Sequence, residues 1–184
     1  MYRTRRALLA SLLVSMTVAL GFALSGIPNV ELMTMTVFVA GYVLGWRLGV
    51  AVGAASIAAY SLFNPLGAAM PPLLAAQMVG FSVIGLGGAL AGPVIVRLAP
   101  RWLAFFASGL TGFVLTVTYD LLTNIGAYVT FMGDESASSL LKFVGTGMLF
   151  MLMHVVWNTG LFLVVLKPVL AVMAGYRLDL SEGR

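Results

Sequence analysis

The sequence contains no cysteine, and only one histidine, His154, in 184 residues. The absence of cysteine excludes disulfides, thiolate metal sites and thiol nucleophiles. One histidine cannot build a multi-histidine metal centre, and the sequence has no G-x-S-x-G, H-E-x-x-H or G-x-x-x-x-G-K-[ST] motif. We therefore predict that the protein is not an enzyme, with no catalytic residue, no metal site, no intrinsic cofactor and no ATPase motif of its own.

Charged residues are also scarce. They make up 9% of the chain, hydrophobic residues make up 61%, and the mean hydropathy is +1.05. So few charges cannot cover the surface of a water-soluble globule of this length, which leaves the lipid bilayer as the solvent. The basic pI of about 9.8 reflects short loops between apolar segments. It indicates contact with anionic membrane lipids and no nucleic-acid partner.

Apolar segments predict an all-α membrane protein with six transmembrane helices in a single integral membrane domain, residues 1–184. The segments span roughly 7–24, 30–45, 48–63, 73–93, 103–131 and 142–166. Most reach the length of about 20 residues that crosses a bilayer, whereas the second and third are short. We separate those two because Arg47 would otherwise lie in the middle of one span, where a charge is costly.

The distribution of basic residues predicts the orientation of these helices. If the N-terminus is cytoplasmic, nine of the ten Lys and Arg residues lie inside and only Lys142 lies outside, which is the positive-inside pattern. The inside residues are Arg3, Arg5, Arg6, Arg47, Arg97, Arg101, Lys167, Arg177 and Arg184. The outer loops carry Glu31, the turn over 64–72, and Asp134 with Glu135. Both termini are therefore expected in the cytoplasm.

Small residues recur at four-residue intervals, a spacing that lets helices approach closely. Gly41, Gly45, Gly49 and Gly53 follow this interval across the second and third segments, and Gly88 and Gly92 repeat it in the fourth. Internal packing explains most such spacings. A similar stripe near the inner end of the first helix consists of Ala7, Ser11 and Ser15, and it either packs internally or docks a partner helix.

Polar residues within the spans are the candidates for function, because ionisable groups are expensive in a membrane. Asp120 and His154 lie about 16 and 18 Å from the outer ends of their helices by helical rise. Asn124 and Tyr128 share the helix face of Asp120, and Asn158 shares that of His154. The other candidates are Trp157 in the sixth span and, near the outer ends of the spans, Asn29, Glu31, Tyr60, Asn64 and Gln77. Together they predict an outward-facing ligand pocket, although a structural Asp–His pair and interhelical hydrogen bonds are the alternatives.

Several stretches resemble the substrate-binding S components of energy-coupling factor (ECF) vitamin transporters. They are Gly26-Ile-Pro-Asn-Val-Glu-Leu-Met-Thr34, Ala40-Gly-Tyr-Val-Leu-Gly45, Asn64-Pro-Leu-Gly67, Pro71-Pro72 and Gln77-Met-Val-Gly80. The resemblance implies an S-component-like bundle in a prokaryotic cell membrane. It also implies a vitamin-like ligand captured from outside, a transmembrane coupling subunit and two ATPase subunits that use ATP. The family's Ala-x-x-x-Ala docking motif reads Ala7-x-x-x-Ser11 here.

The sequence therefore predicts a binding subunit for cobalamin or for a small N-heterocycle such as a thiamine or pyridoxine precursor. Two carboxylates beside one histidine favour a cationic or donor-rich ligand, and Tyr60, Tyr128 and Trp157 are suited to stack on a flat ring. The main alternative is a self-sufficient secondary transporter or channel in which Asp120 and His154 relay protons. A membrane scaffold without a ligand is the third.

Overall fold

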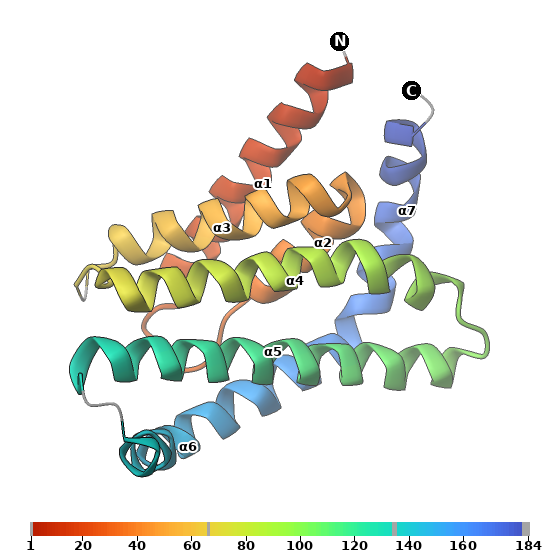
Figure 1. Cartoon of the computed structure of the whole chain (residues 1–184). Coiled ribbons are helices and arrows are strands. Elements are labelled where there is room, and N and C mark those ends of the chain that lie inside the picture. The colour runs from red at the N-terminus through yellow and green to blue at the C-terminus, as the bar shows by residue number, and fades with distance from the viewer. Residues whose placement is uncertain (1, 66, 134–135, 182–184) are drawn as a thin grey trace.

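The chain folds as a bundle of helices in the computed structural model, which describes residues 2–65, 67–133 and 136–181 (Figure 1). No strand occurs in these residues. The helices are α1 (Tyr2–Leu24), α2 (Met33–Leu44), α3 (Trp46–Leu62), α4 (Pro71–Arg97), α5 (Arg101–Phe131), α6 (Ala137–Leu161), the π-helical η1 (Phe162–Leu166) and α7 (Lys167–Ser181). The all-helical prediction is confirmed for this part of the chain.

The last predicted helix is longer than expected. It begins at Ala137 and continues without interruption through η1 into α7, which ends at Ser181, whereas the sequence predicted an end near residue 166. The fourth helix also passes its expected end at residue 93, because Pro93 lies inside α4. Proline removes one backbone donor from a helix, yet α4 continues for one further turn to Arg97.

Within the part of the chain that the structure describes, four helical stretches are long and apolar enough to cross a bilayer: Arg3–Leu24, Pro71–Arg97, Arg101–Phe131 and Ala137–Arg177. The shorter α2 and α3 are separate helices, as predicted, and Gly45 alone joins them. Gly45 has φ +83°, a backbone conformation that glycine adopts without steric cost. The chain is therefore a multi-pass membrane protein with a hairpin of two short helices.

The short helix α2 forms the centre of the bundle. Every residue of α2 except Val43 is buried, and α1, α3, α4 and α7 all pack against it. Glycines permit this close packing, because a Cβ atom at Gly41 would overlap the backbone carbonyl of Gly85 on α4. Gly53 of α3 likewise lies directly against the carbonyl of Phe81. The predicted role of Gly41 and Gly53 in helix packing is therefore confirmed.

Basic side chains from distant segments meet at one end of the bundle. Lys167 donates a hydrogen bond to the carbonyl of Leu98 at 2.9 Å, Arg6 donates one to the carbonyl of Leu44, and the Arg177 guanidinium lies 5.1 Å from the ring centre of Tyr42. The turns that follow α1, α3 and α5 lie at the opposite end (Figure 1). Asp134, Glu135 and Arg184, used above to predict orientation, lie outside the described residues.

Candidate functional site

A cavity of about 330 Å³ lies at the end of the bundle opposite the basic residues. Its wall combines the α1–α2 loop with one or two residues from each of several helices. The lining residues used below are Asn29 and Glu31 from the loop, Tyr60 from α3, Phe81 from α4, Tyr119 and Asp120 from α5, and His154 from α6. Five elements that are distant in sequence therefore converge on one small space.

Glu31 is held by the start of α2. Its Oε2 accepts a hydrogen bond of 2.8 Å from the backbone N–H of Thr34, within the first turn of that helix. The N-terminus of a helix carries partial positive charge and favours a carboxylate. The Trp157 indole donates to the backbone carbonyl of Glu31 at 3.1 Å, which ties the loop to α6. Both the side-chain carboxylate and the backbone carbonyl of Glu31 are thus held by hydrogen bonds.

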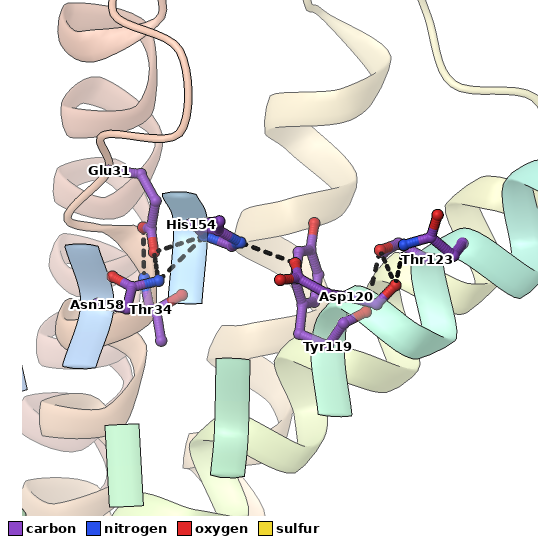
Figure 2. A network of polar contacts seen from close by, with 8 residues as sticks. Glu31, Thr34, Tyr119, Asp120, Thr123, His154 and Asn158 are labelled. Carbon is purple, nitrogen blue, oxygen red and sulfur yellow. Dashed lines mark hydrogen bonds and ion pairs between the residues drawn. The ribbon is translucent and has the colours of Figure 1, made fainter. Parts of the chain in front are cut away.

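His154 lies between two carboxylates (Figure 2). Its Nδ1 is 2.7 Å from Asp120 Oδ1, and its Nε2 is 3.5 Å from Glu31 Oε1. The Tyr119 ring packs edge to face against the imidazole, with the ring centres 6.1 Å apart. The three ionisable side chains therefore form one continuous polar network across α5, α6 and the α1–α2 loop.

Asn158, one turn after His154, completes this network from a fully buried position. Its Nδ2 donates to Glu31 Oε1 at 2.8 Å and lies 3.0 Å from His154 Nε2. Because an amide NH₂ group only donates, Nε2 accepts from Asn158 when the imidazole is neutral, and it faces Glu31 as an ion pair when the imidazole is protonated. Asn158 thus orients both Glu31 and His154.

The network leaves polar atoms buried without a hydrogen-bond partner among the described residues. They include Asp120 Oδ2, Asn158 Oδ1 and the amide nitrogen of Asn29. Buried polar atoms are nearly always satisfied in folded proteins, by protein, water or ligand. Asp120 and Asn29 both line the cavity, but Asp120 Oδ2 and the Asn29 amide nitrogen have almost no exposed surface, so a bound molecule would reach them only after a small movement of the wall.

The loop carboxylate has a shifted pKa. Burial by itself raises the pKa of Glu31, but hydrogen bonds and charge attraction from His154, together with the hydrogen bonds at Thr34, outweigh it. The net result is a pKa below the ordinary value. Glu31 therefore remains ionised around neutral pH, and it contributes negative charge to the cavity wall.

The structure brings together most, but not all, of the predicted site residues. Asn29, Glu31, Tyr60, Asp120 and His154 line the cavity, and Asn158 and Trp157 hold Glu31 from behind. Four other predicted residues do not line it. Asn124 folds back to donate to the backbone carbonyl of Asp120, Tyr128 donates to the carbonyl of Ser136, Asn64 lies in the turn after α3, and Gln77 lies on α4.

Three contributing residues were not predicted. Tyr119 and Phe81 form an aromatic wall, with their ring centres 5.1 Å apart, and Thr34 supplies the backbone donor to Glu31. Tyr119 directly precedes Asp120 in the sequence, so its position could have identified it as a candidate, whereas Phe81 is indistinguishable by sequence from the other apolar residues of α4.

The predicted docking residues Ala7, Ser11 and Ser15 are all exposed on α1.

The chain matches no protein-family model, no curated protein and no solved structure.

Proposed function

We propose that the protein is the substrate-binding subunit of an ECF-type importer and that the cavity captures a vitamin or vitamin precursor. The Glu31–His154–Asp120 network carries this proposal, because it brings three ionisable groups to the wall of one cavity, and two of them, Asp120 and His154, lie in candidate membrane spans. Ionisable groups in membrane spans are costly and mark ligand or ion sites. The position of the cavity opposite the basic end supports entry of the ligand from outside, given the orientation that the positive-inside pattern predicts.

The size of the cavity favours a small ligand. About 330 Å³ is at the lower end of the range for pockets that bind drug-sized molecules. Cobalamin, a macrocycle with an attached nucleotide, is several times larger than such a space. Between the two ligand classes that the sequence suggested, the cavity therefore supports the small N-heterocycle.

The charge and shape of the wall favour a flat ligand with a donor or cationic group. The site holds two carboxyl groups, those of Glu31 and Asp120, beside a single imidazole. Asp120 Oδ2 is an unsatisfied acceptor, and a protonated ring nitrogen or amine satisfies such an atom with a charge-assisted hydrogen bond. Tyr60, Tyr119 and Phe81 supply aromatic surfaces beside it. The amide nitrogen of Asn29 would then donate to an acceptor elsewhere on the ligand.

Energy for import would come from partner subunits, since the sequence has no nucleotide-binding motif. The exposed stripe of Ala7, Ser11 and Ser15 on α1 suits close approach of a helix from the coupling subunit, which carries two ATPases. Ser11→Leu or Ala7→Trp should abolish ATP-dependent uptake and leave ligand affinity unchanged. Uptake that survives both substitutions would place docking on another face.

A proton relay through Asp120 and His154 is the rival function. Such a relay needs polar groups that continue toward the opposite end of the bundle. One turn beyond Thr34 and Asn158, however, Phe38 and Phe162 pack edge to face in the hydrophobic core, with ring centres 5.4 Å apart. This packing supports a closed binding site over a conduit.

Mass spectrometry tests the proposed function. Wild-type protein and the Asp120→Asn variant are purified in parallel from a vitamin-replete culture, and the small molecules released by denaturation are identified. We expect a small heterocycle at a stoichiometric amount in the wild type and a depleted amount in the variant. Proton flux into liposomes that contain only this protein, with no released molecule, would instead establish the rival function.

A further inference from the structure

A second cavity, of about 480 Å³, lies between α1, α2 and α7. It is a groove with aliphatic walls, to which Met16 of α1, Val39 of α2 and Met173 of α7 contribute. The hydroxyl of Thr36, one of its few polar groups, already donates to the carbonyl of Leu32 at 2.8 Å. The groove therefore offers hydrocarbon contact and little hydrogen bonding, which distinguishes it from the polar cavity.

The groove is long and apolar. Its lining on α1 extends from Leu9 to Leu20, which is about 16 Å of helix. Met35, Val39 and Val43 line it from α2, and Val169 and Met173 line it from α7. An extended hydrocarbon chain along the groove would therefore contact apolar side chains on both sides.

One end of the groove is basic. Tyr176 and Leu9 mark this end of the lining, where both chain termini lie (Figure 1). Arg177 follows Tyr176 and is held against the Tyr42 ring, while Arg6 lies one turn before Leu9 and binds the last carbonyl of α2. Arg3 and Arg5 are exposed nearby on α1. The sequence places only Asp179 and Glu182 in the same terminal region, so positive charge predominates.

We propose that this groove binds one acyl chain of an anionic membrane phospholipid, whose phosphate lies at the Arg6 and Arg177 end. The aliphatic walls match the chain, and the guanidinium groups match the phosphate, to which arginine binds in a bidentate manner. The Ala7–Ser11–Ser15 stripe is on the opposite side of α1 from Met16 and Leu20, given 100° per residue. The lipid and a docked partner would therefore occupy different faces of the same helix.

Lipid retention tests this site. The full-length protein is delipidated and mixed in detergent with equal amounts of phosphatidylglycerol and phosphatidylcholine, and the retained lipid is counted by native mass spectrometry. We expect one phosphatidylglycerol per chain to be retained preferentially. Arg177→Gln should reduce this preference about fivefold, as expected for one basic residue. Arg47→Gln, which makes the same charge change at an exposed position outside the groove, should leave the preference intact.

A second pair of variants tests the acyl-chain site separately from the charge. Met16→Trp fills the groove and should abolish retention of both lipids. Leu8→Trp alters an exposed α1 residue outside the lining, so this variant should retain lipid as the wild type does. Equal retention of the two lipids by the wild type would overturn the proposal. So would an equal loss of preference in the Arg47→Gln protein, or full lipid retention in the Met16→Trp protein. Loss of partner co-purification with unchanged lipid retention in Met16→Trp would show a helix-binding groove instead.

Discussion

Individual side chains decide whether the polar cavity is a ligand site or a structural network. Asp120→Asn and His154→Ala should each weaken ligand binding by about 1–3 kcal/mol, because removing one partner leaves the desolvation cost of the others uncompensated. Isothermal titration of the purified variants with the molecule released from the wild type measures this loss. Gln77→Leu, a substitution outside the cavity wall, serves as the matched control. Unchanged affinity in both variants would show that the Asp120–His154 pair has only a structural role.

The lowered pKa of Glu31 gives a prediction in pH. A carboxyl group whose pKa is depressed by folding stabilises the protein above its ordinary pKa, and this contribution is lost as the pH falls through the depressed value. The thermal midpoint of the wild type in detergent should therefore exceed that of Glu31→Gln from pH 7 to about pH 5. The difference should shrink as the pH falls below about 4. A difference that stays constant to pH 3 would contradict the depressed pKa.

The sequence identifies the charged members of the site better than its aromatic and amide members. Glu31, Asp120 and His154 are conspicuous because few ionisable residues lie in or beside apolar segments. Gln77 was chosen by depth along its helix, but depth does not determine the direction of a side chain around the helix axis. Tyr128 was chosen because it shares the helix face of Asp120, yet it lies two turns further along α5, where its hydroxyl donates to the carbonyl of Ser136. Phe81 is one of many apolar residues in α4. Its position on the wall follows from helix packing, which a single sequence does not specify.

At the scale of the helices, glycine contacts determine how closely α2, α3 and α4 approach. Gly53→Ala should destabilise the protein by about 1–3 kcal/mol, because the added Cβ would overlap the backbone of Phe81, which moves only if the helices separate. Gly85→Ala should act in the same way through the backbone of Gly49. Thermal unfolding in detergent measures both effects.

The control for these two variants is Gly145→Ala on α6, where the added Cβ meets no atom within 4 Å. Because alanine favours helix more than glycine does, Gly145→Ala should leave the thermal midpoint unchanged or raise it. Equal destabilisation by all three substitutions would show that the α2–α3–α4 contact is not the cause of the loss.

Hydropathy predicts where helices exist better than where they end. The break at Gly45 was found within two residues because the charge of Arg47 marks it. The continuation of α4 past Pro93 and of α6 through η1 into α7 was not predicted. A proline is compatible with a helix when its lost hydrogen bond is tolerated, and a π-helical turn has no clear sequence signature. The predicted sixth helix ended at residue 166, just before Lys167, although lysine is a good helix former.

At the scale of the whole molecule, the orientation in the membrane underlies the proposed direction of capture. Single cysteines at Ser136 and Ala99, both exposed and at opposite ends of the bundle, suit this cysteine-free chain. An impermeant thiol reagent should label Ser136→Cys in intact cells and Ala99→Cys only after permeabilisation. Labelling of Ala99→Cys alone in intact cells would invert the orientation and place the polar cavity on the cytoplasmic side.

Trp157 provides the most direct test of the central claim, which is that the polar cavity binds a small ligand. Its indole donates to the carbonyl of Glu31, whereas Trp46 and Trp102 lie at the basic end. In a Trp46→Phe, Trp102→Phe protein, Trp157 is the remaining tryptophan, and its fluorescence reports on the Glu31 loop. The small-molecule fraction released from wild-type protein is titrated back into this emptied protein, with and without Asp120→Asn. We predict a saturable change at one ligand per chain that Asp120→Asn weakens at least tenfold, which corresponds to about 1.4 kcal/mol. An unchanged Trp157 signal, or equal titration curves for the two proteins, would contradict the account.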